Sequence, residues 1–193
     1  MRRAIPALLA LALSLTACQS TTQTASSPVT AASSATSPVT PAPTPSVAMT
    51  AGFKVSDVQE AEKVYREFYA ALLGAQRKGG AASLPPALAK LLEPPASTYI
   101  AALLKSDFED GTRLTSPHNG VLTLIPAEGH YRGDSLVAIR ACADDQHLRF
   151  KRSDGATAKG HLTLNYAYFH RSATGRLVIF DTTTTRDSSP CSQ

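Results

Sequence analysis

The chain has 193 residues, of which 43% are hydrophobic and 18% charged, with 13 Pro, 3 Cys and no Trp. These values indicate one ordinary domain with appendages, and they exclude a fibrous, a disulfide-dense or a wholly disordered protein. The formal net charge is +4, from 19 basic and 15 acidic side chains. Without Arg2 and Arg3, which lie in a segment that we expect to be removed, the balance is 17 minus 15, or +2. Such a small excess gives no reason to expect nucleic acid as a partner.

The N-terminus has the features of an export signal. Met1-Arg2-Arg3 is cationic, and the apolar run from Ile5 to Leu15 has signal-peptide length but is too short to span a bilayer. The sequence Leu15-Thr16-Ala17-Cys18 resembles the lipobox of bacterial lipoproteins. That resemblance implies cleavage between Ala17 and Cys18, with a diacylglyceryl group on the Cys18 thiol. The alternative is an ordinary secretory signal with a cysteine there by chance.

We therefore expect residues 1–17 to be a lipoprotein signal peptide. The protein would then be anchored by lipid on the extracytoplasmic face of the cell membrane, which is its expected partner there.

Residues 18–50 are expected to be a disordered tether. Ser, Thr, Pro and Ala make up 26 of the 32 residues from 19 to 50, and none of the 32 is charged or aromatic. Such a segment cannot bury enough apolar surface to offset its ordering entropy. As a flexible coil it spans on the order of 30 Å. The tether is either unmodified or O-glycosylated, and its composition is compatible with both.

Residues 51–193 are expected to fold, beginning with a long helix. Ser56 and Gln59 have the spacing of a capping box, and Gly79-Gly80 is a stop signal. An apolar stripe at helical spacing predicts the buried face. Its members are Val58, Ala61, Val64, Tyr65, Phe68, Tyr69 and Leu72.

Two shorter helices are expected to follow. Pro85-Pro86 opens the first, and Pro94-Pro95 ends it because a residue before proline is pushed out of the helical region. Pro95 suits the first turn of the second helix, and Gly111 ends it. Their apolar residues are Leu88, Leu91 and Leu92 in the first and Tyr99, Ile100, Leu103 and Leu104 in the second.

Beyond Gly111 the sequence favours β-strands. Segments rich in β-branched and aromatic residues alternate with Gly and Asp at hairpin spacing. The expected strands are Val121–Ile125, Ser135–Ala143, His161–His170 and Leu177–Thr184, with a shorter candidate at His147–Phe150. Helices followed by strands predict an α+β fold with an antiparallel sheet.

Alternation along two strands predicts which side chains face the helices. In the expected strand Ser135–Ala143, Val137, Ile139 and Ala141 should face the helices, so that Arg140 and Cys142 point away. In the expected strand His161–His170, we expect the more apolar of the two alternating sets to face the helices. That set is Leu162, Leu164, Tyr166 and Tyr168. A single bulge would reverse either assignment.

Several short motifs accompany this order of elements. They are Pro95-Ala96-Ser97-Thr98-Tyr99, Ile139-Arg140-Ala141-Cys142-Ala143-Asp144, the Asp154-Gly155 turn and the terminal Pro190-Cys191. Together they resemble the NTF2-like (SnoaL-like) cone fold, as found in a group of actinobacterial secreted lipoproteins. The resemblance implies N-terminal helices packed on a curved antiparallel sheet of four to six strands. Ala143 departs from the usual Ala-Cys-Val-Asp, and Gly175-Arg176-Leu177 departs from the usual Gly-x-Trp.

The cysteines are expected to have separate roles. With Cys18 lipidated, Cys142 and Cys191 remain to form a disulfide in an oxidising compartment. The alternative is two free thiols. A nucleophilic Cys142 is disfavoured, because no activating base is marked nearby and a disulfide would consume the thiol.

Acid–base chemistry is the main catalytic possibility. An Asp inside an apolar cone would have a raised pKa and act as a base. The candidates are Asp144, Asp145 and Asp181, with Tyr65, Tyr69, Tyr166 and Tyr168 as the candidate pocket. The simpler interpretations are a strand-end turn for Asp144-Asp145 and ordinary core for the helical tyrosines. The catalytic pattern of the family does not map onto this chain residue by residue.

Other chemistry finds little support in the sequence. The five histidines lack metal-site spacing, and there is no nucleophile elbow or phosphate-cradling loop, so we expect neither metal nor cofactor. Arg149, Lys151 and Arg152 form a basic cluster that either touches anionic lipid or is a solvated turn.

Three functions remain open. The leading one is non-enzymatic binding of a small apolar ligand or a protein partner at the cell envelope. The alternatives are a cone-pocket enzyme, isomerase-like or hydrolase-like, that uses an Asp/Tyr pair, and a structural envelope component whose cone is filled by its own side chains.

Overall fold

The computed structural model of the chain describes residues 49–50, 52–127, 129–185 and 191, all within one compact unit, residues 43–193. The expected signal peptide, Cys18 and the tether up to residue 48 lie outside the described residues. In the part that is described, no helix is both long and apolar enough to cross a membrane.

The first helix, α1 (Val55–Arg77), follows directly on a small antiparallel pair, β1 (Met49–Thr50) and β2 (Phe53–Lys54). Regular structure therefore includes the last two residues of the expected tether, Met49 and Thr50. The predicted capping box is wrong, because the helix starts before Ser56 and Lys54 occupies the N-cap without a side-chain hydrogen bond. The chain passes from the β2 pair straight into the helix, which leaves Ser56 inside it.

The buried stripe of α1 agrees with the predicted one except at its end. Leu73 is buried where Leu72 was expected, and Leu72 is half-buried. The helix stops at Gly79-Gly80 as predicted. Gly80 has φ +74, and a Cβ on it would lie 2.2 Å from the Leu104 carbonyl oxygen. Glycine is therefore needed there for the close approach of the third helix.

The other two helices differ from expectation in their bounds. α2 (Pro86–Ala89) is short, and the residues after it bond to the last long strand, with the Glu93 N–H donating to the Ile179 carbonyl. α3 (Ala96–Asp110) has Pro95 at its N-cap, after a cis Pro94–Pro95 bond, and ends at Gly111 as predicted. Leu104 is buried, whereas Tyr99 and Leu103 of the predicted stripe are exposed.

The four long predicted strands form one antiparallel sheet in the order β4-β5-β8-β9. They are β4 (Val121–Pro126), β5 (Val137–Asp144), β8 (Leu162–Arg171) and β9 (Leu177–Thr185). A second sheet has the order β3-β6-β7, with β3 (Arg113–Leu114), β6 (Arg149–Lys151) and β7 (Thr157–Lys159). Of these three only β6 was anticipated, because two or three mostly exposed residues carry no readable alternation.

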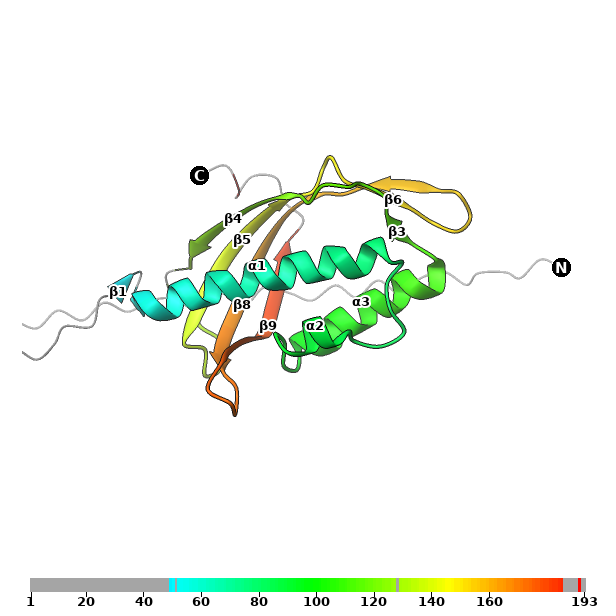
Figure 1. Cartoon of the computed structure of the whole chain (residues 1–193). Helices are drawn as coiled ribbons and strands as arrows, with labels where there is room; N and C mark the ends of the chain where they lie inside the picture. The colour runs from blue at the N-terminus through cyan, green and yellow to red at the C-terminus, as the bar shows by residue number, and fades with distance from the viewer. Residues whose placement is uncertain (1–48, 51, 128, 186–190, 192–193) are drawn as a thin grey trace, which may run out of the picture. The chain divides into compact units, whose positions relative to one another are not determined.

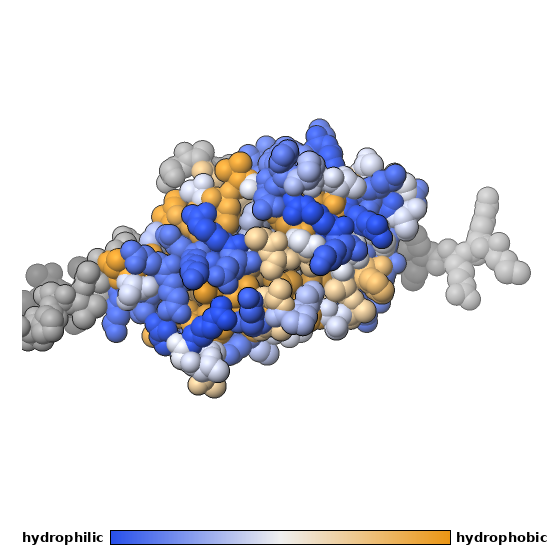
Figure 2. Space-filling view, in the orientation of Figure 1, coloured by the Kyte–Doolittle hydropathy of each residue, from blue (hydrophilic) through white to orange (hydrophobic). Residues whose placement is uncertain are grey.

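The long sheet curves, and α1 lies against its concave face with α2 and α3 beside it (Figure 1). α1 contacts β5 and β9, and α3 contacts β9. This arrangement, with helices packed on a curved antiparallel sheet, is the α+β architecture expected from the sequence. Hydrophilic side chains cover most of the face on which α1 lies, and hydrophobic ones surface in separate small areas (Figure 2).

The strand register settles which side chains face the helices. Residues that pair across an antiparallel ladder point to the same side of the sheet. Val137, Ile139 and Ala141 face α1 as predicted, and they pair with Phe169, Ala167 and Asn165 of β8. The helix-facing set of β8 is therefore the opposite of the predicted one, and Leu162, Leu164, Tyr166 and Tyr168 share the other side with Arg140 and Cys142. We call that other side the outer face.

Candidate functional site

The structure does not assemble the predicted pocket of four tyrosines. Tyr65 and Tyr69 lie on α1 and are buried against the inner side of the sheet. Tyr166 and Tyr168 lie on the outer face. The prediction fails because it placed the more apolar of the two alternating sets of β8 toward the helices. In the structure the helix-facing positions hold Ala167, Phe169 and a hydrogen-bonded Asn165.

On the inner side, a phenol and a carboxyl from the predicted candidates do meet. The Tyr69 hydroxyl donates a short hydrogen bond to Asp145 Oδ1. Asp145 follows the end of β5, and its backbone is held by the His161 carbonyl and the Leu148 N–H at 3.1 and 2.8 Å. The pair thus joins α1 to the point where the chain leaves the long sheet.

Burial controls the protonation of this pair. Desolvation raises the pKa of Asp145, while the hydrogen bond from Tyr69 and the charge of His147 oppose the rise. Desolvation also raises the pKa of Tyr69, and the hydrogen bond and charge of Asp145 raise it further. Burial and then the Asp145 charge raise the pKa of Tyr65, which a hydrogen bond with Asn165 lowers in part. Both phenols therefore remain protonated, and Tyr69 is a fixed donor.

Two glycines close over the Tyr69–Asp145 pair. A Cβ on Gly120 would lie 1.8 Å from Asp145 Oδ1 and 2.3 Å from the Tyr69 hydroxyl oxygen. A Cβ on Gly160 would lie 2.2 Å from the Asp145 carbonyl oxygen. The backbone therefore covers the shared oxygen atoms, leaving no room beside them on the Gly120 side for a reacting molecule.

The loop that carries Gly120 is itself held in place. Arg77, at the end of α1, donates to the His118 carbonyl at 2.8 Å and to Asn119 Oδ1 at 2.7 Å. The His147 ring contacts the Asn119 carbonyl through Nε2 at 3.2 Å. These contacts make the Tyr69–Asp145 pair part of a structural junction between α1 and the two sheets.

Apolar side chains fill the space between the helices and the sheet. Phe169, Ile139 and Ile179 of the sheet, like Leu88 and Leu104 of the helices, are completely inaccessible to solvent. These residues belong to one hydrophobic core cluster between the helices and the sheet.

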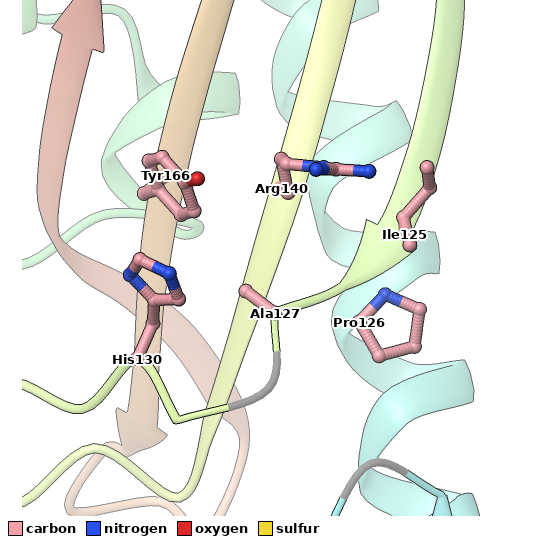
Figure 3. A pocket seen from close by; sticks show the side chains of 6 residues that line it. All are labelled: Ile125, Pro126, Ala127, His130, Arg140 and Tyr166. Carbon is pink, nitrogen blue, oxygen red and sulfur yellow. The ribbon is translucent and has the colours of Figure 1, made fainter. Parts of the chain in front are cut away.

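The outer face carries a pocket of about 330 Å³ near the end of β4. We call it the outer pocket and define it by its lining residues, which are Ile125, Pro126, Ala127, His130, Arg140 and Tyr166. The His130 and Tyr166 rings stack with centroids 4.3 Å apart and 20° between their planes. Figure 3 shows this stack on one side, Ile125 and Pro126 on the other, and Arg140 between them.

The outer pocket was not predicted as a site. The one available signal was Arg140, an arginine expected to point outward from an otherwise apolar strand. His130 could not be found in this way, because it lies in the loop between β4 and β5 and reaches Tyr166 only through the fold.

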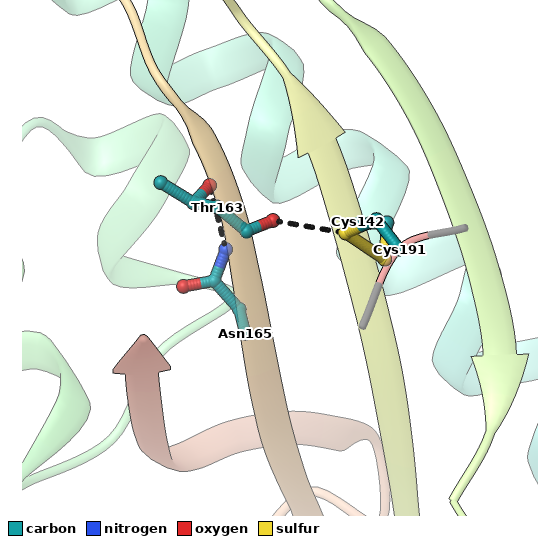
Figure 4. The surroundings of a disulfide bond; sticks show 4 residues. All are labelled: Cys142, Thr163, Asn165 and Cys191. Atoms are coloured by element: carbon teal, nitrogen blue, oxygen red, sulfur yellow. Dashed lines mark hydrogen bonds between the residues drawn. A yellow bond between two sulfur atoms is a disulfide. The ribbon is translucent and has the colours of Figure 1, made fainter. Parts of the chain in front are cut away.

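The predicted disulfide is present. Cys142 on β5 is bonded to Cys191, with 5.6 Å between their Cα atoms and 49 residues between them in sequence (Figure 4). Cys142 points to the outer face as predicted, two residues along the strand from Arg140. The bond fixes the C-terminal Cys191 beside the central strands of the sheet.

The remaining candidate groups have structural partners. Asp181 pairs with Arg132 on the outer face, and Asp144 Oδ1 accepts from the Gln146 N–H in the expected strand-end turn.

The arginines of the predicted basic cluster also have partners. Arg149 donates to the Gln146 and Leu148 carbonyls, and Arg152 pairs with Asp154. Among the described residues, no group of three or more His, Cys, Asp or Glu is placed to hold a metal ion.

No protein-family model matches the chain, and no curated protein matches it in sequence. Similar solved structures include a Shewanella frigidimarina protein provisionally described as a ketosteroid isomerase. It is 15% identical, with 65% of this chain and 94% of that one covered and a TM-score of 0.29. ActVI-ORFA from Streptomyces coelicolor is 16% identical, with 69% and 98% covered and a TM-score of 0.34. Neither likeness assigns an activity to this chain.

Proposed function

We propose that the protein is a lipid-anchored protein of the cell envelope whose NTF2-like domain binds a ligand without converting it. The outer face of the sheet, rather than the interior of the cone, is the binding surface. One contrast carries this proposal. The helix-facing side is filled by side chains such as Ile139 and Phe169, whereas the outer face has a pocket.

The anchor rests on the N-terminal sequence. The cationic start, the short apolar run and Leu15-Thr16-Ala17-Cys18 occur in the order of a lipoprotein signal. Two acyl chains on one residue give stable membrane attachment, where a single chain gives only marginal binding. The Ser/Thr/Pro/Ala-rich segment after Cys18 gives the domain reach away from the membrane surface.

The anchor is tested by replacing Cys18. The Cys18→Ala variant lacks the only thiol in the lipobox, so we expect it to move from the membrane fraction to the soluble fraction or to remain uncleaved. Ser20→Ala, two residues further on, is the matched control and should fractionate like the natural chain. A Cys18→Ala chain that is processed normally and stays in the membrane fraction would contradict the anchor.

A second candidate function, acid–base catalysis, is favoured by the contact between Tyr69 and Asp145. A carboxyl of raised pKa beside a permanently protonated phenol is an arrangement that such catalysis uses. The backbone at Gly120 argues against this function, because it occupies the space next to both reacting atoms. The pair fits a structural role better.

A further inference from the structure

Arg140 lines the outer pocket and has no partner among the residues that the structure describes. Its side chain is half-buried on β5, and neither a hydrogen bond nor an ion pair joins it to another described residue. Other arginines are paired, Arg132 with Asp181 and Arg171 with Asp57 and Glu60. A half-buried guanidinium on a central strand has lost part of its hydration, and an anion would restore its hydrogen bonds.

The surroundings of Arg140 suit an anion with an apolar body. Of the six lining residues none is acidic, so an anion meets no like charge in the pocket wall. Ile125 and Pro126 form an apolar wall opposite the stacked His130 and Tyr166 rings, and Ala127 lies between the two sides. The volume of about 330 Å³ lies at the lower end of the range for small-molecule sites.

We infer that the outer pocket binds a small carboxylate with an aromatic or other apolar body, its charged end on Arg140. This inference rests on the proposed binding function and names the class of its ligand. Guanidinium matches the planar, singly charged carboxylate with two parallel hydrogen bonds. A phosphate group carries up to two negative charges, and the six lining residues offer one permanent cation. The carboxylate is therefore the better match in charge.

Benzoate, with its neutral amide benzamide, provides a direct probe pair. Both are titrated into the full-length protein while the backbone amides are followed by two-dimensional NMR. We expect benzoate to shift the resonances of Ala127, His130, Arg140 and Tyr166. Benzamide should bind about tenfold more weakly or worse, because it lacks the charge that strengthens the hydrogen bonds. Phenyl phosphate, the third probe, should also bind more weakly than benzoate.

Variants at Arg140 identify the group responsible. Arg140→Gln should weaken benzoate binding about tenfold or more and leave benzamide unchanged. Arg140→Lys keeps the charge without the fork of donors, so it should bind benzoate with intermediate affinity. The matched control is Arg152→Gln, an exposed arginine outside the outer pocket, which should bind benzoate like the natural chain.

Equal binding of benzoate and benzamide would overturn the inference. So would benzoate shifts confined to helix-facing residues, or full benzoate affinity in Arg140→Gln. Tighter binding of phenyl phosphate than benzoate would replace the carboxylate by a phosphate ligand. After any of these results, the proposed ligand-binding function still stands if the natural chain carries a ligand when it is isolated from its own cells. If it carries none, both the binding function and the carboxylate inference are wrong.

Discussion

Asp145 shows how one side chain can resemble a catalytic group while serving the fold. Its carboxyl accepts from Tyr69, and Gly120 covers the atoms that they share. Desolvation raises its pKa, which means that burial in the folded state penalises the ionised form. A base that must take a proton from a substrate needs an approach path, and the backbone at Gly120 closes one side of it.

The raised pKa of Asp145 predicts a pH-dependent contribution to stability. This contribution is fully present below the pKa of the unfolded chain, 3.8, and is lost as the pH rises through the higher pKa of the folded state. An asparagine at this position would not ionise and could still accept from Tyr69. We therefore expect the stability of Asp145→Asn, relative to that of the natural chain, to increase when the pH is raised from about 3 to about 7.

Urea unfolding at both pH values measures this difference. Glu109→Gln is the control, because the Glu109 side chain is 62% exposed and its difference from the natural chain should change little. A loss of relative stability in Asp145→Asn as the pH rises would contradict the account. It would mean that ionised Asp145, held by Tyr69, stabilises the fold.

Single residues also show how far the sequence could lead to the candidate site. The outward direction of Arg140 and Cys142 followed from alternation in β5, and the structure confirms it. The stack of His130 on Tyr166 could not be predicted, because it joins a residue of the loop before β5 to a residue of β8, far along the chain. The contact between Tyr69 and Asp145 crosses 76 residues of sequence and likewise depends on the fold.

Among the elements, β8 shows most clearly that the alternation of apolar and polar residues does not always predict which side of a strand faces the helices. Its apolar set was expected to face the helices, whereas the pairing of Ile139 with Ala167 places that set on the outer face. Asn165 occupies an inner position because Thr184 donates to it at 2.6 Å and Tyr65 is its neighbour. Both sides of β8 carry buried residues, so hydropathy does not show which set faces the helices, whereas the register with β5 does.

The disulfide ties the end of the chain to β5, and its removal should lower the melting temperature. Closing a loop of 49 residues contributes about 4 kcal/mol in the chain-entropy model. For a domain of this size, that corresponds to a drop on the order of 10 °C in Cys142→Ser under non-reducing conditions. Calorimetry of the natural chain and the variant measures it.

Cys191→Ser is the matched control for this experiment, because it breaks the same bond from the chain end without changing β5. Both variants should melt at about the same temperature, and a reducing agent should lower the melting temperature of the natural chain alone. Unchanged melting in both variants would show that the bond contributes nothing to stability.

For the whole molecule, the order of elements was the most predictable property. The long helix, the two shorter helices and the four long strands were all expected, because each carries its own periodicity over several residues. The short strands β1, β2, β3 and β7 were not, since each has only two or three residues. The contrast between the buried helix-facing positions and the pocket on the outer face also needed the structure, because it depends on how all elements pack together.

The central claim is that the domain binds a ligand at the outer pocket. Native mass spectrometry of the full-length protein, isolated from cells that make it, tests this claim most directly when the natural chain and Arg140→Gln are compared. We predict an additional small mass on the natural chain that leaves on denaturation and is absent from Arg140→Gln. An unliganded mass for both chains, or the same additional mass on both, would contradict the claim.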